Sequence, residues 1–212
     1  YPFAIEVMKG VNRAIAESEF DLLVYTTGSV RKSGRAYAER KYVSLLTKSI
    51  SDGVIIVAPV VGEFNTDEPI ISIDPVMSNP TNPAVHATNY HGSMEAMEYL
   101  IGLGHKRIGY IGGRVELESS NRRLLGYRDA LKKANLPIDE ELIASGDFTT
   151  ETGISCSRML LSLPNRPTAI FASNDQMAMG VFQVAEEMGL RIPEDLSVVG
   201  FDNIPESKYL GL

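Results

Sequence analysis

The sequence has few basic residues, a single cysteine and no long apolar run, and each of these absences excludes a class of protein. Among its 212 residues, 20 Lys and Arg stand against 27 Asp and Glu, which gives a formal net charge of −7. A nucleic-acid-binding face needs an excess of basic residues, so this segment is not expected to bind DNA by itself. One cysteine excludes an internal disulfide and a cysteine-rich metal site. No apolar run reaches the ~20 residues of a membrane span, and no signal peptide is recognisable.

The residues that are present predict a folded α/β protein. Hydrophobic residues make up 44% of the chain and charged residues 22%, which are ordinary globular fractions. Several short runs are apolar at consecutive positions, as in parallel strands covered by helices on both faces. The runs lie at 22–25, 54–57, 70–73, 107–111, 168–172 and 196–199. Between them, apolar residues recur every three or four positions, which is typical of amphipathic helices.

Helix ends and one change of composition indicate how the chain is organised. Ala4, Met8, Val11 and Ile15 form a helical stripe that predicts a first helix packed on a sheet. Glycines at positions 104 and 189 follow two further stripes and predict left-handed helix caps. The segment Asn-Pro-Thr-Asn-Pro at 79–83 interrupts the rhythm. We therefore expect two α/β lobes, an N-terminal one over residues 1–88 that looks incomplete and a C-terminal one over residues 89–212.

Motifs for catalysis, metals and cofactors are not found. No Gly-x-x-x-x-Gly-Lys-Ser/Thr string is present, and the glycines between Gly109 and Gly113 lack the spacing of a dinucleotide fingerprint. Cys156 lies in a predicted helix on the apolar side, as a buried structural thiol does. His86, His91 and His105 have no metal-ligand spacing. The sequence therefore predicts no catalytic residue, no bound metal and no cofactor.

Polar side chains close several of the predicted strands. In an open α/β sheet, ligands bind beyond the carboxyl ends of the strands. Carboxylates accept hydrogen bonds from vicinal hydroxyls, a guanidinium donates two at fixed spacing, and an aromatic face covers apolar C–H groups. These groups together favour a small polyhydroxylated ligand. The candidate ligand-binding residues are Phe3, Asp74, Arg123, Phe148, Asn174 and Asp202.

Each candidate also has a simpler structural interpretation. Asn174 or Asp175 can cap the helix that follows. Asp74 and Asp202 can be turn formers. Arg123, expected in the passage from loop to helix, can be a surface ion pair, and the two aromatic residues can be core. The shared position at one sheet edge is the stronger argument for a ligand site.

Four strings resemble the regulatory domain of the LacI/GalR family of bacterial transcription repressors. They are Gly-His-Lys-Arg-Ile-Gly-Tyr-Ile-Gly-Gly at 104–113, Arg-Leu-Leu-Gly-Tyr-Arg-Asp-Ala-Leu at 123–131, Ser-Asn-Asp-Gln-Met-Ala-Met-Gly at 173–180 and Ile-Pro-Glu-Asp-Leu-Ser-Val-Val-Gly-Phe-Asp-Asn at 192–203. The resemblance covers nearly the whole chain. By position, Asp74, Arg123, Asn174 and Asp202 match the family's ligand contacts, Phe148 matches its cleft aromatic residue, and Phe3 falls in a helix that lines the cleft.

The resemblance implies a two-lobed fold like that of the periplasmic sugar-binding proteins, lacking the first strand and the C-terminal part. It implies a small-molecule effector, most simply a sugar, held between the lobes of a cytoplasmic homodimer with no membrane partner. Operator DNA would be bound only through a headpiece absent from this chain.

Two other functions compete with this one. A periplasmic sugar-binding protein of a transporter would share the fold and the cleft, and only residues upstream of Tyr1 distinguish it. An α/β enzyme is disfavoured because no nucleophile, metal set or cofactor loop was found.

Overall fold

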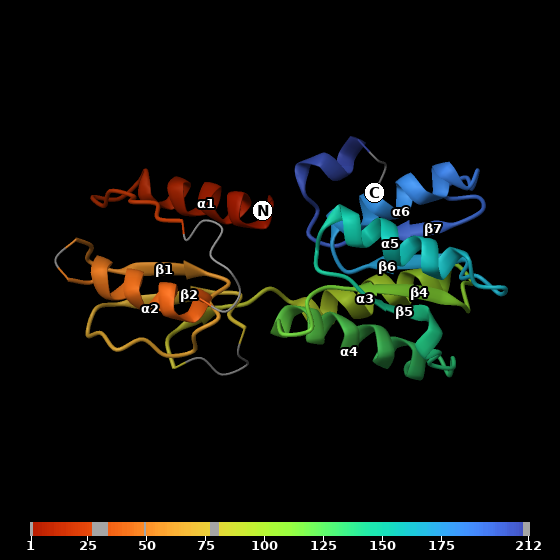
Figure 1. Cartoon of the computed structure of the whole chain (residues 1–212), viewed down its shortest axis with the longest axis horizontal. Coiled ribbons are helices and arrows are strands. Elements are labelled where there is room, and N and C mark those ends of the chain that lie inside the picture. Colours follow the sequence, from red (N-terminus) through yellow and green to blue (C-terminus); the bar gives the residue numbers. More distant parts are fainter. Residues whose placement is uncertain (1, 27–33, 49, 77–80, 210–212) are drawn as a thin grey trace. The chain divides into compact units, whose positions relative to one another are not determined.

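The computed structural model describes residues 2–26, 34–48, 50–76 and 81–209. These described residues belong to two compact units, with the division of the chain between His86 and Ala87. Each unit contains one parallel sheet with its own helices (Figure 1). The α/β fold with parallel sheets is therefore confirmed. Residues 79 and 80 of the predicted boundary segment lie outside the described residues. That the units are the two lobes of one effector-binding domain stays a prediction at this point.

Unit 1 has a three-stranded sheet in the order β1-β2-β3. Its elements are α1 (Pro2–Ile15), α2 (Arg35–Leu46), β1 (Val54–Val57), β2 (Ile70–Ile73) and β3 (Ala84–Val85). One face of the sheet packs under α2 in a small cluster of four buried residues, which are Val43, Val61, Phe64 and Ile70. Because successive strand residues point to opposite faces, Ile55 and Ile71 lie together on the other face, and they are 48% and 42% exposed.

Two expectations for unit 1 differ from the structure. The apolar run at 22–25 forms no strand, and its side chains are between 41% and 63% exposed. Its composition suits a strand, but in the described part of unit 1 no neighbouring strand supplies a ladder for it. The first helix forms as its stripe predicts. None of its described side chains, 3–15, is buried, so the expected packing of this helix on a sheet is not seen.

Unit 2 has a four-stranded sheet in the order β5-β4-β6-β7 with helices on both faces (Figure 1). The order reverses between β4 and β6, which is a topological switch point. The elements are α3 (Asn89–Gly102), β4 (Ile108–Gly112), α4 (Glu118–Lys133), a 3-10 helix (Glu140–Leu142), β5 (Ile143–Ser145), α5 (Thr150–Leu161), β6 (Ala169–Ala172), α6 (Asp175–Glu187), β7 (Ser197–Val199) and a last 3-10 helix (Pro205–Tyr209).

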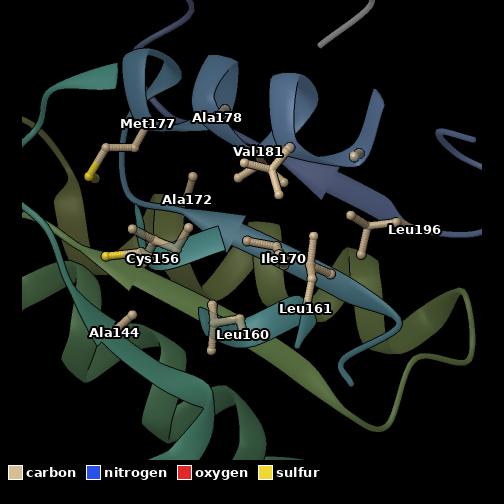
Figure 2. Close-up of a cluster of buried hydrophobic side chains, with 13 residues drawn as sticks. Ala144, Cys156, Leu160, Leu161, Ile170, Ala172, Met177, Ala178, Val181 and Leu196 are labelled. Carbon is tan, nitrogen blue, oxygen red and sulfur yellow. The ribbon is translucent and has the colours of Figure 1, made fainter. Parts of the chain in front are cut away.

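Two buried clusters fill the two sides of this sheet. On the α5 and α6 side, Leu160, Ile170 and Val181 meet with no exposed surface (Figure 2). On the α3 and α4 side, Tyr110, Tyr127 and Phe171 pack together, with ring centroids of Tyr110 and Tyr127 4.9 Å apart. Every residue of β4 and β6 is buried, which is why these strands read as continuous apolar runs.

The predicted glycine caps are confirmed. Gly104 has φ +97° and Gly189 has φ +68°, in the left-handed region that suits glycine. The main-chain N–H groups of Gly104 and His105 then close the end of α3 by donating to Ile101 and Leu100. These sharp helix ends return the chain to the sheet and set where β4 and β7 begin.

Candidate functional site

The candidate site lies at the edge of the unit 2 sheet where the parallel strands end. Ser173 and Asn174 follow β6, Phe201 and Asp202 follow β7, and Phe148 follows β5. The strands are parallel, so their carboxyl ends meet at one edge, and that edge includes the switch point between β4 and β6. The topology therefore brings residues far apart in the sequence to one place.

Arg123 is the centre of this edge. It lies in the second turn of α4 and not in the loop before it, and it is 6% exposed. Its Nε donates to Asn89 Oδ1 at 2.8 Å, Nη1 donates to the carbonyl of Ser173, and Nη2 donates to Asp202 Oδ1 at 3.2 Å. The guanidinium is thus tied to α3 and to the ends of β6 and β7. The surface ion pair considered for Arg123 is excluded by this burial.

Two aromatic rings flank the guanidinium. The Arg123 Cζ atom lies 3.8 Å from the Phe201 ring centroid and 5.8 Å from that of Phe148. An aromatic face attracts the cation and also restricts its orientation. The guanidinium plane is therefore fixed by ring contacts as well as by its three hydrogen bonds.

Phe148 depends on a glycine at the end of β4. A Cβ on Gly113 would lie 2.0 Å from the Phe148 ring, so the ring packs directly against bare main chain. Phe148 itself has φ +73°, an unusual conformation for a residue with a bulky side chain. Its ring is half-buried and also packs against the cluster below. Phe148 therefore belongs both to the core and to the strand-end group. The strand-end group comprises the residues that meet around the guanidinium at this sheet edge, which are Asn89, Arg123, Phe148, Ser173, Asn174, Phe201 and Asp202.

Asn174 is a helix cap, and it also joins the strand-end group. Its Oδ1 accepts from the Met177 N–H at 2.9 Å, which caps α6, and its Nδ2 donates to the Phe148 carbonyl at 3.2 Å. The amide group thus links α6 to the loop that carries the aromatic ring. The second N–H of the Asn174 amide takes part in neither of these two bonds.

Asp202 has φ +96° and a side chain that is 18% exposed. Its neighbour Asp175, the first residue of α6, is 3% exposed, and its carboxylate accepts from the Ile204 N–H at 2.8 Å. Burial raises the pKa of Asp175 above its ordinary value, although main-chain hydrogen bonds with Ile204, Phe201 and Asn203 act against this. The turn that carries Asp202 is therefore anchored on a buried carboxylate.

The remaining two candidates belong to unit 1. Phe3 is half-buried in the first turn of α1. Asp74 follows β2 with φ +50°, and its N–H donates to the Val85 carbonyl at 2.9 Å. The left-handed φ of Asp74 ends the strand, and both its ligand-contact and its turn-former interpretations stay predictions. A ligand contact from either residue stays a prediction.

Several residues around Arg123 in unit 2 could not be identified as site residues from sequence patterns alone. Asn89, Phe201 and Asp175 all contact or support the Arg123 group, but none closes a predicted strand with a side chain suited to a hydroxyl-rich ligand. Phe201 stands in the same string as Asp202, and Asp175 follows Asn174. Adjacency to a candidate was the available signal for these two residues. No such signal exists for Asn89, which reaches Arg123 because α3 packs on α4.

The described residues contain no group of three or more His, Cys, Asp or Glu side chains that could hold a metal ion. Cys156 is 8% exposed, and burial raises the pKa of its thiol, which lowers its reactivity. The ring of His105 bridges Thr168 Oγ1 at 2.8 Å and Ser197 Oγ at 3.0 Å, at the opposite end of the strands from Arg123. Among the helices described, none is long and apolar enough to cross a membrane.

The doubly wound parallel sheet of unit 2 and its polar strand-end edge define a class, the open α/β domains that bind small ligands at a switch point. Comparison with known proteins then identifies the family. The family described as periplasmic binding protein-like domain matches residues 97–211.

Curated relatives are repressors. The transcriptional repressor CytR of Escherichia coli K12 is 32% identical over 214 residues, covering 98% of this chain and 61% of the repressor. The probable repressor ExuR of Bacillus subtilis is 34% identical, covering 99% of this chain and 62% of that protein. The chain thus spans about three fifths of the length of these relatives.

Among solved structures, a sugar-binding transcriptional regulator of the LacI family from Escherichia coli, crystallised with phosphate, is similar with a TM-score of 0.78 and 29% identity, covering 96% of this chain and 74% of that one. The chain therefore belongs to the periplasmic binding protein-like family, as an effector-binding domain of the LacI/GalR type. The resemblance seen in the four sequence strings is confirmed.

Proposed function

We propose that this chain is the effector-binding part of a sugar-responsive transcriptional repressor, and that its effector contacts the strand-end group of unit 2. The observation that carries the proposal is the Arg123 group: a buried guanidinium held by Asn89, Ser173 and Asp202 and flanked by two aromatic rings. A guanidinium has five N–H donors, and three of them donate in this group. Two donors are left for ligand hydroxyls.

The other members supply complementary chemistry. The remaining Asn174 N–H can donate to a hydroxyl oxygen, the Asp202 carboxylate can accept from hydroxyl groups, and the Phe148 ring can cover an apolar C–H face. Donors, an acceptor and an aromatic face are what a hydroxyl-rich ring requires. Phe3 and Asp74 remain proposed contacts. Asp74 matches a ligand-contacting position of the family, and Phe3 falls in the helix segment that lines the family's cleft.

The coupling to transcription follows from differential binding. An effector that binds one conformation of a repressor better shifts the population toward it, and the link between effector and operator is reciprocal, typically about 1 to 3 kcal/mol. We propose that operator DNA is bound by a segment outside these 212 residues, because the net charge of −7 here is unsuited to DNA. The chain would bind its effector without transforming it.

The named relatives support a cytoplasmic repressor over a transporter component, since both are described as transcriptional repressors. We also propose a homodimer. An apolar groove on unit 2, lined by Met179, Phe182, Leu190 and Ile192 with two polar neighbours, is a surface that a second copy can cover. Sedimentation velocity at several protein concentrations tests this, and a monomer at all of them would contradict it.

The effector proposal is tested by calorimetric titration with D-ribose, D-glucose, cellobiose and adenosine. At least one sugar is expected to bind, and Arg123→Ala is expected to weaken that binding tenfold or more, because charge-assisted hydrogen bonds to the ligand are lost. Arg122→Ala is the matched control. It removes the neighbouring arginine of the same helix, whose side chain is 53% exposed and pairs with Glu118, and should leave the affinity unchanged.

Arg123→Ala also leaves buried partners without their hydrogen bonds, so its fold is checked by circular dichroism. Phe148→Ala provides a second variant that retains those bonds, and it is expected to weaken sugar binding by a smaller factor. Unchanged affinity in both variants, or binding of adenosine alone, would contradict the proposal as stated.

A further inference from the structure

Asp175 holds the turn after β7 through both its side chain and its main chain. Its Oδ2 accepts from the Ile204 N–H at 2.8 Å, and its own N–H donates to the Phe201 carbonyl at 2.9 Å. The residue is 3% exposed. An acidic residue in the first turn of a helix is ordinarily solvated and interacts with the helix dipole. Asp175 is buried and bound to another segment, so a role in α6 alone does not account for it.

The turn that Asp175 holds is conformationally demanding. Asp202 and Asn203 are consecutive residues with φ +96° and +55°, and neither is glycine. Residues in this region persist only where the surrounding structure fixes them. The carboxylate of Asp175 reaches into the turn, because a Cβ on Gly200 would lie 2.2 Å from its Oδ1. The absence of a side chain at position 200 thus gives the carboxylate room under the turn.

Two contacts of Arg123 come from this turn, residues 200–204. Asp202 Oδ1 accepts from Nη2 at 3.2 Å, and the Phe201 ring centroid lies 3.8 Å from the guanidinium carbon. Phe201 is bound to Asp175 through its own carbonyl, and Asp202 lies between Phe201 and Ile204, the two residues whose main chain is hydrogen-bonded to Asp175. A displacement of this turn would change the orientation of the guanidinium and the place of the Asp202 carboxylate together.

We infer that Asp175 is a positioning residue of the site: by anchoring the 200–204 turn, it sets Asp202 and Phe201 against Arg123 without contacting the effector itself. The inference rests on the proposed function, because Asp202 and Arg123 are proposed effector contacts. A readout that needs no ligand separates the two. The Nε–H of Arg123 is buried and bonded to Asn89, so its resonance in a ¹H–¹⁵N spectrum of the full chain reports on the guanidinium.

The experiment compares Asp175→Ala with Asp175→Asn. The alanine variant loses the acceptor for the Ile204 N–H, and its Arg123 Nε resonance is expected to shift, with about a tenfold loss of affinity for the sugar that the unsubstituted chain binds among the four probes. The asparagine variant keeps one acceptor oxygen and is expected to restore part of both. This rescue distinguishes hydrogen bonding to the turn from simple loss of side-chain volume.

Two controls separate positioning from stability. Val184→Ala removes two methyl groups from a side chain of α6 that is 1% exposed, and should lower stability while leaving the Arg123 resonance and the affinity unchanged. Asp195→Ala removes another carboxylate of unit 2 that accepts a main-chain N–H, from Arg191 at 3.0 Å, and should change neither.

If the Arg123 resonance stays in place in Asp175→Ala, the positioning role is wrong whatever the affinities show. Should Asp175→Ala fail to fold, Gly200→Ala decides, because its Cβ would lie 2.2 Å from the Asp175 Oδ1 and displace the carboxylate from the turn. An unshifted resonance and full affinity in that variant overturn the inference. No binding of any probe by the unsubstituted chain would contradict the proposed function only, and the resonance would then decide the role of Asp175 by itself.

Discussion

The two units share an α/β pattern but differ in how deeply the side chains of their strands are buried. In unit 2 both faces of the sheet are covered by helices, and residues such as Ile170 and Phe171 have no exposed surface. In unit 1 one face of the sheet has a buried cluster of four residues, whereas Ile55, Ile71 and Val85 on the other face are 42% to 58% exposed. Apolar burial is the main source of stability, so unit 2 is expected to be the more stable part. The group around Arg123 is therefore built on the better-packed unit.

The largest expected effect comes from comparing isoleucines in the two sheets. Ile170→Ala should reduce the free energy of unfolding by about 2 to 5 kcal/mol, because a fully buried side chain leaves a cavity. Ile71→Ala should cost less than about 1 kcal/mol, since that side chain is 42% exposed. Urea unfolding followed by circular dichroism, with hydrogen exchange of the β4 and β2 amides to assign each change to its unit, measures both.

Ile70→Ala is the control within unit 1. Ile70 precedes Ile71 on the same strand, points to the opposite face and is 5% exposed. The Ile70→Ala substitution should therefore reduce the free energy of unfolding clearly more than Ile71→Ala. Equal costs for the two positions would contradict the assignment of the covered face. A small cost at Ile170 would remove the contrast between the units.

A second, smaller contrast uses glycines. Gly113→Ala should destabilise unit 2 by about 1 to 3 kcal/mol, because its Cβ would meet the Phe148 ring at 2.0 Å and force the ring to move. Gly10→Ala lies in α1 with nothing within 4 Å of the new Cβ, and should stabilise that helix by up to about 1 kcal/mol. Thermal and urea unfolding of both variants give the signs. A neutral Gly113→Ala would show that the Phe148 ring is not seated on that glycine.

The smallest effect is a difference in pH dependence. Burial lowers the pKa of His105 in unit 2, so the stability that its neutral form provides is present above the unfolded value near 6.5 and is lost as the pH falls through the lower folded value. Burial raises the pKa of Glu39 in unit 1, so its contribution is present below the unfolded value near 4.5 and is lost as the pH rises through the higher folded value. Hydrogen exchange of each unit's strand amides between pH 4 and 7 should show opposite slopes.

Glutamine variants are the controls for these slopes. Glu39→Gln retains an acceptor for the Val60 and Val61 N–H groups, which lie 2.9 and 3.0 Å from the carboxylate, but does not titrate. His105→Gln likewise retains a polar group between Thr168 and Ser197. Each variant should flatten the slope in its own unit. A slope that persists would assign the pH dependence to other groups.

Much of the fold follows from periodicity. Strands β1 and β2 have the predicted bounds. Strands β4, β6 and β7 each begin one residue inside their predicted runs, and β4 also extends one residue past its run. The run at 22–25 was wrong as a strand because strand formation needs a partner as well as composition. Strands β3 and β5 were missed, since two or three residues are too few to show a period. The start of α4 was misplaced because Leu117 offers no capping side chain.

Sequence alone determined the α/β class, the left-handed caps at Gly104 and Gly189, the capping role open to Asn174 and the family, because these depend on local periodicity, on single-residue conformations and on ordered strings of residues. Tertiary structure decided which strand ends are neighbours, that Arg123 is buried against Asn89, Ser173 and Phe201, and that Asp175 supports the turn carrying Asp202. Those relations include hydrogen bonds between positions 29 to 79 residues apart, the longest being that of Arg123 with Asp202, and only the packing of helices on a sheet brings such positions within hydrogen-bond distance.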